Sequence, residues 1–175
     1  MAMSAAQALA LIRIGVGLYF LTQGFNKLAS GWLSSGDTLV NQFLNPAVQN
    51  GRAEAFYQSF LGNVVIPHGT LFSQLTALGE FAVGISLTLG FLTRAGGIVG
   101  MWLNLNYMLM KGLANSGGSV DRLFFLVELM LVLAAAGLVW GVDGLIRQRW
   151  GNHPLARVIA GDQRREAVPP FARAA

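Results

Sequence analysis

Four long apolar stretches most constrain how this chain can fold. The hydrocarbon core of a bilayer is about 30 Å thick, and a helix needs about 20 apolar residues to cross it. Four stretches reach that length, at about residues 7–28, 71–92, 95–113 and 123–142. Charged residues make up only 11% of the chain, against about 25% in a typical soluble domain. We therefore predict an all-α integral membrane protein, a bundle of four transmembrane helices in a lipid bilayer.

The first stretch is expected to be retained and not cleaved as a signal peptide. Its N-terminal flank carries no basic residue. The stretch also contains Arg13, Gln23 and Lys27, which a signal-peptide core does not tolerate.

The distribution of basic residues predicts the orientation of the four spans. An even number of spans leaves both termini on one side, and Arg94 falls on that side with the basic residues of the C-terminal tail. These are Arg147, Arg149, Arg157, Arg164, Arg165 and Arg173. The other side has only Arg52, Lys111 and Arg122. Since positive residues collect on the cytoplasmic side, we expect both termini in the cytoplasm and the chain in the inner (plasma) membrane.

The chain divides into a transmembrane domain, residues 1–143, and a basic cytoplasmic tail, residues 144–175. Within the first, the loop at 31–70 carries apolar residues at helical spacing, which predicts two short amphipathic helices on the extracytoplasmic face. They either cap the bundle or rest on lipid headgroups. In the tail, Leu155, Val158 and Ile159 predict one interfacial helical turn, and the rest is expected to be disordered or to dock on a partner.

Several classes of site and partner are excluded by residue types. The chain has no cysteine, and its two histidines, His68 and His153, are far apart in the predicted topology. We therefore expect no disulfide, no metal site and no haem. The basic tail beside a membrane span follows the positive-inside rule, and without interleaved aromatic residues it does not indicate binding to nucleic acid.

Polar side chains inside the predicted spans mark the candidate site, because an ionisable residue in a bilayer is costly and needs a reason. By helix rise, most lie between the midplane and the outer surface, so they would form one outward-facing pocket if they face inward. They are Gln23, Lys27, Glu80, Asn104, Asn106, Tyr107 and Glu128. Lys27 would pair with Glu80 or Glu128. Arg13 lies deeper, and would bind backbone carbonyls or extend to the cytoplasmic headgroups.

Three segments together resemble a known family. Residues 13–28 read RIGVGLYFLTQGFNKL, residues 79–94 read GEFAVGISLTLGFLTR, and residues 104–107 read NLNY. Their order and spacing, within about residues 9–142, resemble the DoxX/DoxD family of small four-helix membrane proteins. The NLNY element is more similar to the DoxD branch, named for the small membrane subunit of thiosulfate:quinone oxidoreductase. The resemblance implies a four-helix bundle associated with quinone-linked sulfur or thiol redox systems.

These observations support two main hypotheses. In the first, the chain is a redox-associated subunit that binds a quinone or a small oxyanion such as thiosulfate. Glu80 would accept a proton and Lys27 would hold the anion, as the catalytic pair. The remaining binding residues would be Asn104, Asn106, Tyr107, Gln23 and Glu128. In the second, the chain is a structural or assembly subunit of a larger membrane complex, or a homo-oligomer, and the polar residues only join helices.

A small-molecule permease is a third hypothesis. The four stretches show no inverted repeat, which makes transport the less favoured interpretation.

Overall fold

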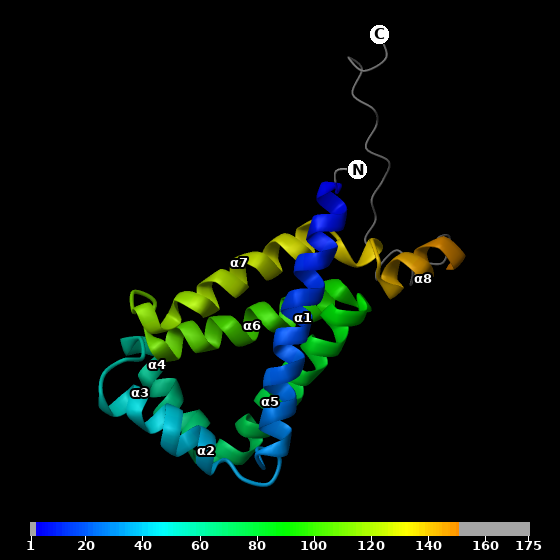
Figure 1. Cartoon of the computed structure of the whole chain (residues 1–175). Coiled ribbons are helices and arrows are strands. Elements are labelled where there is room, and N and C mark those ends of the chain that lie inside the picture. The colour runs from blue at the N-terminus through cyan, green and yellow to red at the C-terminus, as the bar shows by residue number, and fades with distance from the viewer. Residues whose placement is uncertain (1–2, 151–175) are drawn as a thin grey trace.

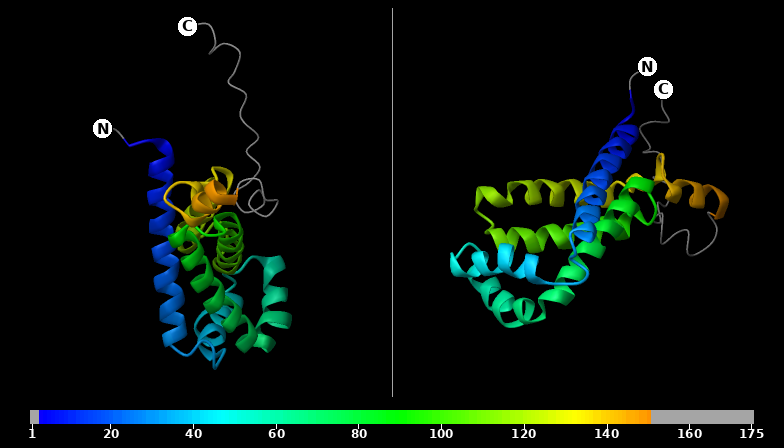
Figure 2. Two further views of the ribbon diagram at one scale, coloured as in Figure 1. Left: turned by 90° about the vertical axis from the view of Figure 1, so that its right-hand side faces the viewer. Right: turned by 60° about the horizontal axis from the view of Figure 1, so that its bottom comes forward.

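Two antiparallel pairs of long helices form the fold. Helix α1 (Ala5–Ala29) packs along α5 (Gly69–Leu89), and α6 (Thr93–Lys111) packs along α7 (Ser119–Leu133). In this computed structural model, which describes residues 3–150, the second pair crosses the first obliquely (Figure 1). Figure 2 shows the same two pairs from other sides. The described residues form helices and turns without a strand, as the apolar stretches predict.

Glycines allow α1 and α5 to pack closely. A Cβ atom built on Gly24 would lie 2.5 Å from the backbone nitrogen of Phe81, and one on Gly84 would overlap the backbone of Leu21. Only glycine permits such a close approach of two helix backbones, and small residues serve this purpose in membrane helices. Next to this contact along the sequence, the buried side chains of Phe20, Val83 and Leu87 form an apolar cluster.

By length and composition, two helical stretches are able to cross a membrane. They are Ala5–Ala29 and the continuous helical stretch Ala55–Leu89. Helix α6 occupies the place of the predicted third span and α7 that of the first part of the fourth. Neither is among the two stretches that are long and apolar enough to cross a membrane, so the four-span arrangement stays a prediction. Large apolar side chains are exposed on these helices too. On α7, Leu123, Leu126, Met130 and Leu133 are each more than half exposed, as expected of a surface that faces lipid.

The predicted fourth span, 123–142, is not one continuous helix. Helix α7 ends at Leu133, a 3-10 turn follows at Ala136–Leu138, and α8 runs from Val142 to Trp150. Between them, Ala135 and Trp140 adopt left-handed backbone conformations, with φ of 47° and 50°. The apolar stretch therefore predicts a longer continuous helix than this region contains.

Arg13 explains the end of α7. Its side chain is fully buried and donates hydrogen bonds to the carbonyl oxygens of Ala136 (3.0 Å), Val139 (3.3 Å) and Trp140 (2.9 Å). These carbonyl groups lie outside α7 and α8, and a buried carbonyl group needs a donor. Of the two predicted roles for Arg13, the structure shows the one in which it binds backbone carbonyls.

Asp143, at the start of α8, joins the break between α7 and α8 to the N-terminus of α6. Its buried carboxylate accepts hydrogen bonds from the backbone N–H groups of Leu92 (2.8 Å) and Thr93 (2.9 Å). An anion is favourable at a helix N-terminus, where N–H groups lack partners within the helix.

The predicted boundary between residues 143 and 144 falls inside α8, which runs from Val142 to Trp150. The rest of the tail, with the turn predicted at Leu155, Val158 and Ile159, lies outside the described residues.

The segment 31–70 contains two helical stretches, the number that the sequence predicts. The first comprises α2 (Asp37–Leu39), a π-helical turn (Val40–Leu44) and α3 (Asn45–Gln49). The second comprises α4 (Ala55–Phe60), a π-helical turn (Leu61–Val65) and a 3-10 turn (Ile66–His68) that leads into α5. An apolar cluster ties these stretches to α5 and α6. It includes Trp32, Leu39, Leu44, Leu61, Val65, Ala77 and Met110.

Candidate functional site

Polar side chains from all four long helices meet at a pocket of about 210 Å³ between the two helix pairs. We call it the polar pocket. Its lining residues are Tyr19, Phe20, Gln23, Lys27, Trp32, Leu39, Phe43, Glu80, Asn104, Tyr107, Met110, Lys111, Asp121 and Phe124. The crossing of the two helix pairs brings these residues together, because α1 and α5 supply one side and α6 and α7 the other.

Glu80 is the centre of the polar pocket. It is only 3% exposed, and each of its carboxylate oxygens accepts a hydrogen bond at 2.5 Å. One comes from the ammonium group of Lys27 and the other from the hydroxyl group of Tyr107. The predicted pairing of Lys27 with one of two glutamates is therefore decided in favour of Glu80.

These three side chains come from three different long helices. Lys27 is in the last turn of α1, Glu80 is near the middle of α5, and Tyr107 is one turn before the end of α6. The ammonium group of Lys27 also lies 5.2 Å from the centre of the Trp32 ring. Such a cation–π contact helps hold a cation that is mostly removed from water.

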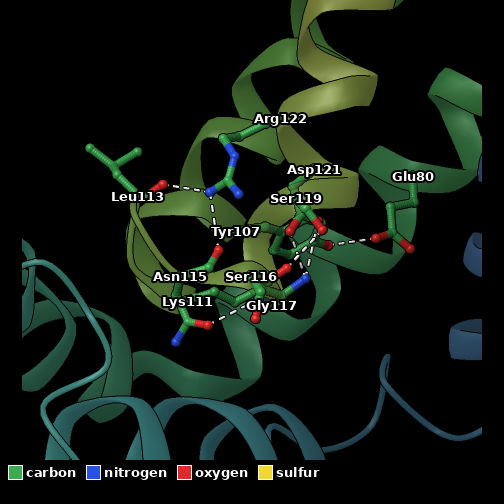
Figure 3. Close-up of polar contacts among 10 residues, drawn as sticks. All are labelled: Glu80, Tyr107, Lys111, Leu113, Asn115, Ser116, Gly117, Ser119, Asp121 and Arg122. Carbon is green, nitrogen blue, oxygen red and sulfur yellow. Dashed lines mark hydrogen bonds and ion pairs between the residues drawn. The ribbon is translucent and has the colours of Figure 1, made fainter.

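A second ion pair borders the polar pocket and was not among the predicted site residues. The ammonium group of Lys111 contacts both carboxylate oxygens of Asp121, at 2.7 and 3.1 Å (Figure 3). Lys111 follows Tyr107 by one helical turn, and its ammonium group lies 5.6 Å from the centre of the Tyr107 ring. The pocket thus contains two cations and two carboxylates. The sequence signal for this pair is a charged residue on each side of the loop 112–118.

Hydrogen bonds from two side chains to its backbone hold that loop in place. The guanidinium group of Arg122 donates to the carbonyl oxygens of Leu113 (2.5 Å) and Asn115 (3.1 Å), as Figure 3 shows. The carboxylate of Glu54 accepts a hydrogen bond from the backbone N–H group of Leu113 at 2.7 Å. These contacts fix the distance between the end of α6 and the start of α7, and with it the position of Lys111 and Asp121.

Among the described residues, Glu128 is connected to the polar pocket only through Asn104. The side-chain amide of Asn104, which lines the pocket, donates to Glu128 at 2.8 Å. Glu128 itself is fully buried between α6 and α7 and is not among the lining residues. Its second oxygen, Oε1, has no hydrogen-bond partner among the described residues and lies against Gly100. The prediction that Glu128 lines the same pocket as Glu80 is therefore wrong.

Asn106 lies on the other side of α6, which also corrects the prediction of one shared pocket. Two residues along a helix differ by about 200° around its axis, so Asn104 and Asn106 face different surroundings. Asn106 accepts a hydrogen bond from the Tyr57 hydroxyl group at 2.5 Å and donates to the carbonyl oxygen of Trp102 at 2.6 Å. It lines a second, larger pocket of about 520 Å³, which we call the apolar pocket.

Of the predicted site residues, Lys27, Glu80, Tyr107, Gln23 and Asn104 share the polar pocket. Tyr107 also lines the apolar pocket, so it stands between the two. Among residues 3–150, no group of three His, Asp or Glu side chains is arranged to hold a metal ion.

The fold and the site define a helical membrane protein with a charged pocket among its long helices. A family model described as "TQO small subunit DoxD" matches residues 9–161. The chain therefore belongs to the DoxD family, and the resemblance seen in its sequence is confirmed. No solved structure matches the chain.

Proposed function

We propose that this chain is a redox-associated membrane subunit that binds a small sulfur oxyanion such as thiosulfate in its polar pocket, with a membrane quinone as the electron acceptor. The description of the family, TQO small subunit DoxD, supports a role in thiosulfate:quinone oxidoreduction. The observation that carries the proposal is the hydrogen-bonded chain Lys27–Glu80–Tyr107, which lies in a pocket that also contains Lys111.

The size of the polar pocket and its two lysines support the choice of a small anion. At about 210 Å³ it is smaller than typical pockets for drug-sized ligands. Each lysine is paired with a carboxylate, so the anion would bind a lysine whose carboxylate partner has taken up a proton. In the reaction, two thiosulfate anions join through a new S–S bond and release two electrons. A quinone supplies the acceptor, taking up those two electrons and two protons to become a quinol.

Protein residues would bind the anion and carry protons. Lys27 and Lys111 would hold the anion, while Gln23 and Asn104 would orient it through their amide groups. Glu80 would exchange protons, because a proton on its carboxylate would release Lys27 toward the substrate. The Tyr107 hydroxyl group, hydrogen-bonded to Glu80, would carry a proton from the polar pocket toward the apolar pocket.

The cellular arrangement that we propose follows the charge distribution. The chain would lie in the plasma membrane as four spans with both termini in the cytoplasm, since seven basic residues would then be on the inner side. It would act as a subunit of a larger complex, in keeping with the word subunit in the family's description.

The test is thiosulfate-dependent reduction of decylubiquinone by the complex isolated from native membranes. We expect Lys27→Met to raise the KM for thiosulfate by about tenfold or more, equivalent to ~1.4 kcal/mol of binding, and Glu80→Gln to lower kcat. Arg52→Met is the matched control, because Arg52 is an exposed cation outside the polar pocket. Unchanged kinetics in both pocket variants, with the complex intact, would contradict the proposal.

A structural role is the second candidate, and one observation favours it. Both oxygens of Glu80 already have donors within the chain, as in polar contacts that only join membrane helices. Under this role, Lys27→Met and Glu80→Gln would lower the yield of the complex without changing KM or kcat per complex. Deletion of residues 151–175 would then release the chain from its partners.

A further inference from the structure

We propose that the apolar pocket is a binding site for the ring of a membrane quinone, with Asn106 and Tyr57 contacting a ring oxygen. The proposal deepens the proposed function and rests on it for the identity of the electron acceptor. It assigns the acceptor to a pocket lined mainly by α4, α5 and α6, which shares Leu39, Tyr107 and Met110 with the polar pocket.

The composition of the apolar pocket fits a flat ring with an apolar tail. Its volume of about 520 Å³ is within the range of small-molecule sites. Most lining side chains are aliphatic or aromatic, including Phe60, Phe72 and Trp102. None of the described residues that line it is charged, so the phosphate group of a phospholipid would find no cation there. A neutral ligand is therefore favoured over a lipid headgroup.

The exposed rim of the apolar pocket faces lipid in a membrane. Leu75 and Leu78 of α5 are 55% and 50% exposed, and Val99 and Trp102 of α6 are 43% and 64% exposed. All four line the pocket. Because an exposed apolar side chain on a membrane helix contacts acyl chains, a ligand dissolved in the bilayer can enter between α5 and α6 without crossing water. The isoprenoid tail of a quinone would extend into the lipid along the same route.

Polar groups are concentrated at one part of this pocket. Tyr57 donates to the side-chain oxygen of Asn106, and Asn106 uses one N–H group to donate to the carbonyl oxygen of Trp102. A side-chain amide has two N–H donors, so one remains to bind a quinone carbonyl oxygen. The Tyr57 oxygen retains lone pairs that can accept a hydrogen bond from a quinol hydroxyl group. One pair of residues thus suits both the oxidised and the reduced ring.

Tyr107 connects this site to the source of protons. It lines the apolar pocket and donates to Glu80 in the polar pocket. Reduction of the ring needs two electrons and two protons, the electrons coming from the sulfur substrate of the proposed function. The protons would come from the solvent side by way of Glu80. Separate sites would let a charged substrate and an apolar acceptor occupy the protein together.

Filling the apolar pocket tests the proposal. Gly79 lines it, and a Cβ atom there would lie 3.5 Å from Leu103 Cδ1, an ordinary contact. Gly79→Leu should therefore fill the pocket with little change to the helix. Gly15→Leu is the matched control, because Gly15 is exposed on α1 with no atom of the described chain within 4 Å of an added Cβ. Asn106→Leu is a second variant, which removes the polar contact without filling the pocket.

The measurement is equilibrium binding of decylubiquinone to the purified full-length chain in detergent, without thiosulfate. We expect the Kd to rise by about tenfold or more in Gly79→Leu and Asn106→Leu, and to stay unchanged in Gly15→Leu and Lys27→Met. Absence of binding to the unmodified chain would overturn the proposal. Unchanged binding of decylubiquinone in Gly79→Leu and Asn106→Leu would also overturn it. Loss of binding in Lys27→Met would overturn it too, because that result would place the quinone in the polar pocket.

The outcome is distinguishable from failure of the proposed function. Thiosulfate is absent from the binding experiment, so a polar pocket that binds no thiosulfate would leave the quinone result unaffected. Conversely, a complex that shows the expected KM change in Lys27→Met but no effect of Gly79→Leu on decylubiquinone binding would keep the proposed function and reject this site.

Discussion

The two buried glutamates show how far surroundings decide the role of a residue. Glu80 has a lysine and a tyrosine as hydrogen-bond donors and lines a pocket. Among residues 3–150, Glu128 has only the amide of Asn104 as a hydrogen-bond donor. Its other oxygen lies against Gly100 without a partner in that range. Glu80 therefore borders a cavity, whereas Glu128 is enclosed between two helices.

Gly100 is the residue that makes room for Glu128, which gives a prediction. A Cβ atom at position 100 would overlap Glu128 Oε1. Gly100→Ala should therefore lower the free energy of unfolding by about 1–3 kcal/mol, the usual cost of overpacking. Gly15→Ala is the control and should be neutral or up to ~1 kcal/mol stabilising, because alanine favours a helix. Thermal unfolding in detergent measures both, and equal stability of the two variants would contradict this account of Gly100.

At the scale of elements, the break between α7 and α8 depends on two charged residues. Arg13 binds the carbonyl groups of the non-helical turn, and Asp143 binds the N-terminus of α6. A buried charge is costly unless it is hydrogen-bonded, and here the unpaired backbone groups of the break supply those bonds. The two buried charges and the unpaired backbone groups of the break therefore stabilise each other.

Removal of Arg13 should consequently be severe. Arg13→Met leaves the carbonyl groups of Ala136, Val139 and Trp140 without their buried donor. We expect a loss of about 3–5 kcal/mol in the free energy of unfolding, because each buried carbonyl group left without a donor costs about 1–3 kcal/mol. Arg149→Met at the exposed end of α8 should change it by less than about 0.5 kcal/mol. Urea unfolding monitored by tryptophan fluorescence compares them, and a small effect of Arg13→Met would show that the break is held by other contacts.

At the scale of the whole molecule, the crossing of the two helix pairs produces the polar pocket. A bundle of four nearly parallel helices would bury the polar side chains against one another. In this chain α6 and α7 cross α1 and α5 (Figure 1), and space remains between the pairs where charged residues from all four helices meet.

The proposed topology is testable at this scale, because the chain has no cysteine of its own. Single substitutions Ser34→Cys, Ser116→Cys and Gln148→Cys place a thiol at exposed positions in two loops and in α8. In intact spheroplasts, a membrane-impermeant maleimide should label positions 34 and 116 but not 148. After permeabilisation all three should react. Labelling of position 148 from outside would mean that α7 does not cross the membrane.

Much of the fold and part of the site were predictable from local sequence. The starts and ends of α5 and α6 follow the predicted spans within a few residues, since long apolar runs favour helices in lipid. The contact of Lys27 with Glu80 follows from the predicted depth of each residue in the membrane, because residues at similar depths on neighbouring helices can meet. The ion pair of Lys111 with Asp121 was missed because both residues are near helix ends, where charges are ordinarily solvated.

Hydrophobicity and charge are properties of each residue, so the amino-acid sequence was sufficient to predict a helical membrane protein and the polar residues inside its apolar stretches. Which of those polar residues share a pocket became clear only from the packing of the helices. The face of α6 that carries Asn106 and the place where α7 ends depend on partners far away in sequence. Arg13 and Ala136 are 123 residues apart. Such contacts depend on the crossing of complete helices, which no local pattern specifies.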